Sequence, residues 1–123
     1  MKSNSQVGNY YKKKTRDWFI KAGFDCEFLE RYTAKYQGYN KFFYAKKDLL
    51  GSDGIAMNGT DIIFWNSKFT VDLNKRKNEI VKAARLEFAK YKFPAFVTKQ
   101  VIIWEYRKSV PLVIDGSDIG GVV

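Results

Sequence analysis

Three polar residues of this chain could form a hydrolytic site: Asp53, Asn66 and Lys68. Carboxylate and amide oxygens can bind a divalent cation such as Mg²⁺, and a lysine beside them can position water and stabilise charge developing on a phosphate. The chain has no histidine and one cysteine, Cys26, which excludes serine–histidine and cysteine–histidine catalysis and a cysteine-rich zinc site. Hydrolysis would therefore depend on carboxylates, lysine, tyrosine and a cation held by oxygen ligands.

A predicted β-hairpin would bring these residues together. Asn58-Gly59 separates two apolar runs, and this pair favours a two-residue type I′ turn. Such a turn pairs Asp53 with Phe64 and makes Asp53 and Asn66 diagonal neighbours on one face, with Cα atoms about 7–8 Å apart. The face that carries them also carries the lysine, whereas Asp61 falls on the opposite face.

Ordinary structural roles remain open for the same residues. An Asp beside Gly near the start of a strand commonly forms a turn, and Asn-x-Lys at the end of a strand is commonly solvated. The hairpin alone therefore does not distinguish a site from a turn.

The hairpin and its approach resemble the PD-(D/E)XK nuclease superfamily. Asp53 followed by Asn66-Ser67-Lys68 resembles its two strand motifs, and Asp48-Leu49-Leu50-Gly51 resembles the lead-in of its Holliday-junction-resolvase-like branch. The resemblance spans about residues 8–115. It implies an endonuclease that hydrolyses phosphodiester bonds of branched DNA with Mg²⁺ or Mn²⁺. Asp53, Asn66 and Lys68 would be its catalytic residues, and the metal ligands would be Asp53, Asn66 and the carbonyl of Ser67.

Two positions depart from the acidic pattern of that family. Lys12 stands where the first helix is expected to carry Glu, and Asn66 brings no charge where Asp, Glu or Gln is usual. A lysine beside the site would lower the affinity for a cation by like-charge repulsion. Glu27 or Glu30 could replace the lost carboxylate or could be an ordinary charge on the strand surface, and Asp48 could be a ligand or a turn residue. The alternative hypothesis is therefore that the chain is a nuclease-fold protein that binds DNA without catalysis. A third hypothesis is a basic structural or scaffold protein.

Composition favours an anionic partner. The length of 123 residues suits one domain. The formal net charge of +9 and the pI near 9.6 favour nucleic acid as the first candidate partner and an acidic membrane surface as the second. No apolar run approaches the ~20 residues that span a bilayer, and the polar start lacks a signal-peptide pattern. We therefore expect a soluble, intracellular, DNA-associated protein. The cations expected to contact DNA are Lys12, Lys13, Lys14, Arg16, Lys46 and Lys47.

The expected elements follow the order αβββαββ, and the expected fold class is mixed α/β. Helices are predicted over about 9–22 and from Asp72 or Asn74 to Tyr91, and strands over 24–36, 39–46, the hairpin, 100–106 and 110–114. The apolar character of the last two strands predicts a sheet covered on both faces, with Trp104 in the core. The resemblance implies a restriction-endonuclease-like αβββαβ core, with a mixed central sheet flanked by helices. Residues 1–7 and 116–123 are expected to be flexible.

A homodimer would follow if the substrate were a two-fold symmetric junction. The aromatic residues Tyr32, Tyr36 and Tyr39 could then serve the interface.

Overall fold

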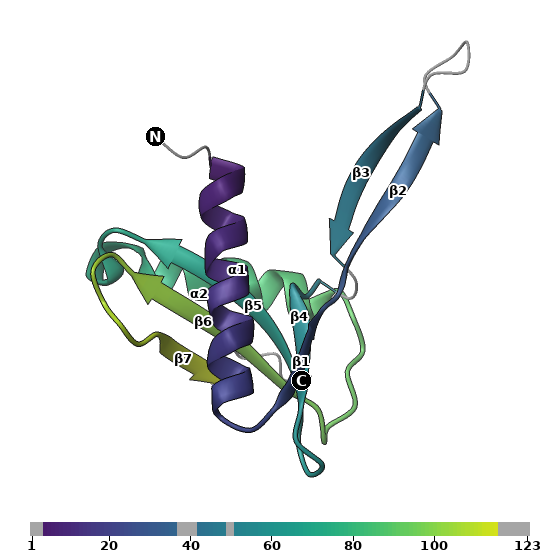
Figure 1. Cartoon of the computed structure of the whole chain (residues 1–123). Helices are drawn as coiled ribbons and strands as arrows, with labels where there is room; N and C mark the ends of the chain where they lie inside the picture. The colour runs from purple at the N-terminus through teal and green to yellow at the C-terminus, as the bar shows by residue number, and fades with distance from the viewer. Residues whose placement is uncertain (1–3, 37–41, 49–50, 116–123) are drawn as a thin grey trace.

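The computed structural model describes residues 4–36, 42–48 and 51–115 (Figure 1). Side chains are described for residues 6–29 and 51–115. In these described stretches, two helices and seven strands follow one another as α1 (Asn4–Lys21), β1 (Asp25–Phe28), β2 (Glu30–Tyr36), β3 (Phe42–Asp48), β4 (Gly54–Met57), β5 (Ile62–Thr70), α2 (Leu73–Ala89), β6 (Thr98–Glu105) and β7 (Leu112–Asp115).

Five strands form one mixed sheet in the order β1-β4-β5-β6-β7. β5 and β6 are parallel and are joined through α2, whereas the other neighbours are antiparallel. The mixed α/β class with a central sheet flanked by helices is thus confirmed. None of the described helices is long and apolar enough to cross a membrane.

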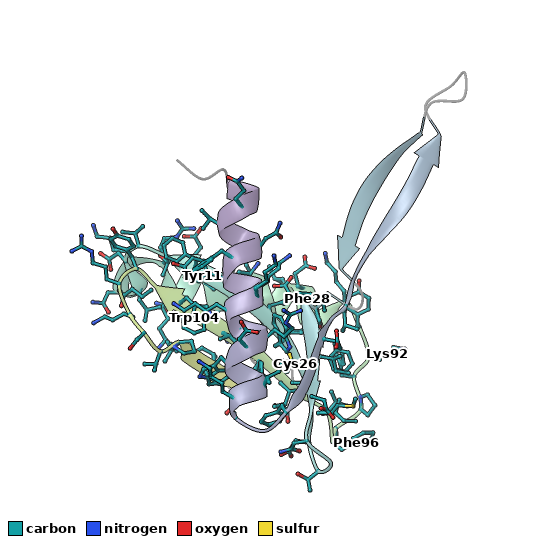
Figure 2. All side chains as sticks on the ribbon, in the orientation of Figure 1. Tyr11, Cys26, Phe28, Lys92, Phe96 and Trp104 are labelled. Carbon is teal, nitrogen blue, oxygen red and sulfur yellow. The ribbon has the colours of Figure 1, made fainter. Side chains whose placement is uncertain are left out.

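The sheet has an apolar core on each face. Phe19 of α1 packs with Trp65, Ile102 and Trp104 on one face, and Phe88 of α2 belongs to the core on the other. Residues 101–104 are all buried, because alternate side chains of β6 enter opposite cores. The predictions of a doubly covered sheet and of a core Trp104 are confirmed. Figure 2 shows Trp104 beside α1, where its ring lies 6.3 Å from that of Tyr11.

The helix boundaries follow local signals only in part. Gly23, with φ of 95°, follows the end of α1 as predicted, but the helix begins at Asn4 rather than near Asn9. Asp72 rather than Asn74 is the N-cap of α2, since its side chain accepts from the backbone N–H of Lys75. Residues 4–7, which were expected to be flexible, therefore belong to a helix.

The predicted strand over 24–36 is wrong, because it is two strands in two sheets. β1 joins the central sheet beside β4, and after Leu29 the chain continues as β2, which pairs with β3. Leu29 donates its backbone N–H to the carbonyl of Asp53 at the point of division. Figure 1 shows the β2–β3 ribbon projecting away from the sheet and both helices. The predicted turn at Gln37-Gly38 and Tyr39 lie outside the described residues.

Candidate functional site

The turn between β4 and β5 has four residues rather than two. The side-chain oxygen of Asn58 accepts from the backbone N–H of Thr60 and of Asp61, at 3.1 and 2.8 Å, and Gly59 has a positive φ of 94°. Because Asn58 closes the turn through its side chain, Met57 pairs with Ile62. The predicted pairing, and with it the type I′ turn, is wrong by two residues. The assignment of side chains to faces survives, because strand side chains alternate with a period of two.

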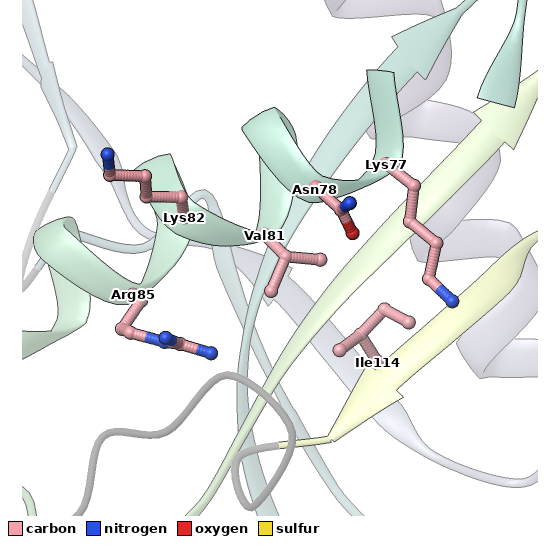
Figure 3. Close-up of a pocket in the computed structure, with 6 residues that line it drawn as sticks. All are labelled: Lys77, Asn78, Val81, Lys82, Arg85 and Ile114. Atoms are coloured by element: carbon pink, nitrogen blue, oxygen red, sulfur yellow. The ribbon is translucent and has the colours of Figure 1, made fainter. Parts of the chain in front are cut away.

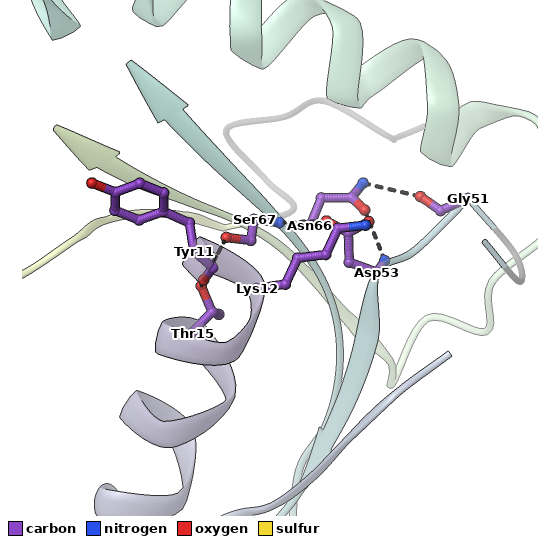
Figure 4. Close-up of polar contacts among 7 residues, drawn as sticks. All are labelled: Tyr11, Lys12, Thr15, Gly51, Asp53, Asn66 and Ser67. Atoms are coloured by element: carbon purple, nitrogen blue, oxygen red, sulfur yellow. Dashed lines mark hydrogen bonds and ion pairs between the residues drawn. The ribbon is translucent and has the colours of Figure 1, made fainter. Parts of the chain in front are cut away.

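In this register Asp53, the residue before β4, lies beside Asn66 of β5 (Figure 4). The backbone N–H of Asp53 donates to the Trp65 carbonyl and to Asn66 Oδ1, at 2.9 and 3.0 Å. Asp53 Oδ2 accepts from the backbone N–H of Ser67 at 2.8 Å, and Asn66 Nδ2 donates to the Gly51 carbonyl at 3.0 Å. Asp53 and Asn66 are only 3% and 5% exposed. The side chains of Asp53 and Asn66 are thus held by hydrogen bonds to backbone groups around the start of β4.

Lys12 of α1 reaches the free side of the Asp53 carboxylate. Its Nζ lies 3.5 Å from Asp53 Oδ1, and the two side chains are 16% and 5% exposed. Figure 4 shows the lysine crossing from the helix to the start of β4. A fixed ammonium therefore neutralises the buried carboxylate.

A buried chain of hydrogen bonds holds α1 over this point. Trp104 Nε1 donates to Thr15 Oγ1 at 2.8 Å, and that hydroxyl lies 2.8 Å from the Tyr11 carbonyl and 2.9 Å from Ser67 Oγ. Ser67 Oγ also donates to the Tyr11 carbonyl at 3.1 Å. Ser67 thus binds the helix through its hydroxyl and Asp53 through its backbone. No local pattern in the sequence predicted this network, because its members lie far apart along the chain.

The residues at this point do not fit a magnesium ion. Mg²⁺ requires near-octahedral oxygen coordination. Here Ser67 N–H and Lys12 engage the two oxygens of Asp53, and the amide oxygen of Asn66 accepts from a backbone N–H. Among the residues that the structure describes, no three acidic or cysteine side chains form a metal-binding cluster. The predicted ligands come together, but the side-chain oxygens of Asp53 and Asn66 are already engaged within the protein.

The predicted lysine of the second motif is separate from these contacts. Lys68 is exposed on β5, two residues beyond Asn66 and on the same face of the strand. No described hydrogen bond or ion pair joins it to Asp53 or Asn66.

The remaining cations of α1 differ in their surroundings. Lys13 is exposed, whereas Lys14 Nζ lies 4.5 Å from the centre of the Trp104 ring. Arg16 lies over the ring of Phe28, with its guanidinium carbon 4.9 Å from the centroid. Cation–π contact therefore occupies two of the cations that were predicted to contact DNA.

The other predicted site residues lie on the ribbon. The registers place Glu30 opposite Asp48 and Arg31 opposite Lys47, with Lys46 next along β3. Asp48 is thus the last residue of a strand rather than part of a turn. The side chains of these residues are outside the described part of the chain.

A second basic surface lies between α2 and β7 (Figure 3). It surrounds a cavity of about 600 Å³. The lining combines cations and an amide with an apolar floor, and its residues are Lys77, Asn78, Val81, Lys82, Arg85 and Ile114. An anion is the ligand that such a lining favours.

Comparison with known proteins gives a likeness of fold. No family model matches the chain, and no curated protein sequence matches it. Among solved structures, the chain is similar to Hjc, a Holliday junction resolvase from the hyperthermophilic archaeon Archaeoglobus fulgidus. The two are 15% identical over 91% of each chain, with a TM-score of 0.44. This likeness assigns neither residues nor an activity to the chain.

Proposed function

We propose that this chain binds DNA without hydrolysing it, and that Lys12 takes the place of a metal ion beside Asp53. The ion pair between these two side chains carries the proposal. At about 4 Å, two unit positive charges repel by about 4 kcal/mol at an effective dielectric constant of about 20, and a divalent ion beside the ammonium meets more. Lys12 would have to leave a largely buried contact before a cation could bind.

The excess of positive charge supports DNA as the partner. The net charge of +9 favours a polyanion, and exposed cations lie on α1 and along the cavity between α2 and β7. Phosphate contacts release counterions, so the affinity should fall steeply as salt rises.

The second candidate is a Mg²⁺- or Mn²⁺-dependent endonuclease that acts on branched DNA. One observation favours it: Asp53, Asn66 and Ser67 meet at a single point despite the changed register. On this alternative, Asp53 and Lys68 are both essential for cleavage.

One pair of assays separates the two functions. The chain is titrated into four-way-junction, duplex and single-stranded DNA at several salt concentrations, and the same substrates are incubated with Mg²⁺ or Mn²⁺. We expect salt-sensitive binding and no cleavage by the wild-type chain. Cleavage that is lost in Asp53→Ala and Lys68→Ala, but kept in the control Lys13→Ala, would establish the endonuclease instead. Absence of salt-sensitive binding to every substrate would leave only the scaffold hypothesis.

A metal-binding measurement tests the role of Lys12 directly. We expect Mn²⁺ to leave the melting temperature of the wild-type chain unchanged. In Lys12→Glu, two carboxylates would face one another, so a bound cation should raise the melting temperature. At a Mn²⁺ concentration of 100 times its Kd, the added free energy of unfolding is about 2.7 kcal/mol. A rise in the wild type equal to that in the variant would show that Lys12 does not exclude the cation.

The homodimer implied by the sequence resemblance stays a prediction. Light scattering of the free chain and of its complex with a four-way junction tests it.

A further inference from the structure

Exposed apolar side chains lie together where the parallel strands β5 and β6 end. Thr70 and Glu105, the last residues of the two strands, are paired, and Tyr106 donates its backbone N–H to the Thr70 carbonyl. Val71 and Tyr106 therefore lie side by side just beyond the strands, and they are 70% and 52% exposed. Exposed apolar side chains that lie together, unlike single ones, mark interaction surfaces.

Aromatic rings of α1 extend this surface. Tyr10, which is 47% exposed, meets Tyr11 edge-on with 4.9 Å between ring centres, and Tyr11 stacks on Phe69 of β5 at 4.4 Å. Burial raises the pKa of Tyr11, and the neighbouring phenols of Tyr10 and Tyr106 raise it further, so these tyrosines lie in one cluster. Tyr10, Val71 and Tyr106, here called the tyrosine patch, thus form one exposed surface.

Two cations lie against the rings of the patch. Lys14 Nζ is 4.5 Å from the centre of the Trp104 ring and 5.9 Å from that of Tyr10. The guanidinium carbon of Arg107 lies 5.2 Å from the centre of the Tyr106 ring. Arg107 has a φ of 65°, a left-handed conformation that residues other than glycine and asparagine rarely adopt. Cation–π contact thus holds positive charge within an apolar surface.

The acids next to the patch do not neutralise these cations. Asp72 and Glu105 each accept from a backbone N–H in the first turn of α2. Among the described residues, no ion pair includes Lys14 or Arg107. The patch therefore offers apolar surface together with positive charge that has no acidic partner.

This combination fits an acidic peptide better than nucleic acid or a second copy of the chain. Unpaired bases bind by stacking on ring faces, but Phe69 covers one face of Tyr11, and the guanidinium of Arg107 lies over one face of Tyr106. Two copies of the patch would bring like charges into one interface, which disfavours association. A peptide with carboxylates beside apolar side chains meets both requirements, because carboxylates form charge-assisted hydrogen bonds with guanidinium and ammonium groups.

We propose that the tyrosine patch binds a partner protein through a segment that combines aspartate or glutamate with large apolar side chains. The apolar side chains of the segment pack on Val71 and Tyr106. Its carboxylates bind Lys14 and Arg107. This inference goes beyond the proposed DNA binding and does not depend on it.

Selection from a library of random short peptides displayed on phage tests the proposal with the full wild-type chain. We expect the enriched peptides to combine acids with an aromatic or large aliphatic residue more often than the unselected library does. An enriched peptide, labelled with fluorescein, is then titrated with the wild type and with variants by fluorescence anisotropy.

Two variants locate the binding site. Tyr106→Ser should weaken peptide binding by about 30-fold or more, which is the loss at an interface hot spot. Phe96→Ser is the matched control, because Phe96 is an exposed aromatic residue just before the other end of β6, and it should leave binding unchanged. Arg107→Gly should weaken binding and lower its salt dependence without lowering the melting temperature, because glycine adopts a φ of 65° without strain. Lost recognition is thereby distinguished from lost folding.

Several outcomes would overturn the proposal. One is that no peptide is enriched, or that the enriched peptides are no more acidic than the library. Another is that Tyr106→Ser and Arg107→Gly bind the peptide as tightly as the wild type does. Loss of salt-sensitive DNA binding in both variants would assign the patch to nucleic acid, and a lower mass of Tyr106→Ser than of the wild type in light scattering would assign it to a second copy. Failure of the wild type to bind any DNA would instead overturn the proposed function and leave this inference intact.

Discussion

The ion pair between Lys12 and Asp53 gives the sharpest energetic prediction. We expect the substitutions Lys12→Met and Asp53→Asn to be strongly non-additive in their effect on the free energy of unfolding. Each single change leaves one charged group without its partner in a largely buried position, whereas the double change removes both charges. Met keeps most of the length of the lysine, and Asn keeps an oxygen that can accept from Ser67.

The size of the coupling follows from the geometry. At 3.5 Å, opposite unit charges attract by about 5 kcal/mol at an effective dielectric constant of about 20. Desolvation opposes this attraction, and the side chain of Lys12 keeps 16% of its exposure, so part of its charge remains hydrated. We therefore expect Lys12→Met to cost about 3 kcal/mol and Asp53→Asn about 2 kcal/mol, with a coupling energy of about 2 kcal/mol.

Urea unfolding of the wild type, both single variants and the double variant measures this coupling. Lys13→Met is the matched control, because Lys13 is exposed on the same helix and should change stability by less than about 0.5 kcal/mol. The m-value should be the same in all five proteins, so that the midpoints report stability alone. Additivity of the two single changes within about 0.5 kcal/mol would refute the ion pair as the contact that fixes Lys12 beside Asp53.

Five other substitutions, at four positions, test the packing of the fold. Thr15→Val removes the acceptor of the Trp104 indole N–H and should cost about 1–3 kcal/mol in urea unfolding, whereas Thr15→Ser should keep most of that stability. Gly54→Ala places a Cβ against a core indole ring and should cost about 3 kcal/mol, while Gly8→Ala, with open space on a helix, should add about 0.5–1 kcal/mol. Burial raises the pKa of the Cys26 thiol from 9.0 to about 11. The unfolded thiol therefore ionises first, and stability should fall as pH rises from about 9 toward 11. Cys26→Ala should reduce that fall, measured by urea unfolding across the same pH range.

Local patterns predicted much of the fold. The helical spacing of apolar residues located both helices, Asp72 served as an N-cap, and the apolar run over 101–104 located a doubly covered strand. These features depend on residues a few positions apart, whose geometry the backbone fixes. The strand over 24–36 was misjudged because its pattern of side chains is continuous, although the chain changes sheets at Leu29. Which sheet a strand joins depends on its partners, and the partners lie elsewhere in the chain.

At the candidate site, too, local features were predictable and tertiary contacts were not. The hairpin and the shared face of Asp53 and Asn66 were predictable, because a shift of two residues in register leaves every side chain on its original face. The turn itself was misread, since Asn58 uses its side chain to close a four-residue loop, where the Asn-Gly pair suggested a two-residue turn. The distance from Lys12 to Asp53 had no signature in the sequence.

The sequence by itself determined the charge, the absence of histidine chemistry, the alternation of strand faces and the presence of a lysine where an acid was expected. Only the tertiary structure decided that this lysine meets Asp53, because the contact depends on how α1 lies across the sheet. Buried hydrogen bonds of Thr15 with Trp104 and Ser67 fix that position. Such bonds join residues far apart in the chain and form only when both sides have been removed from water together, so no local pattern encodes them.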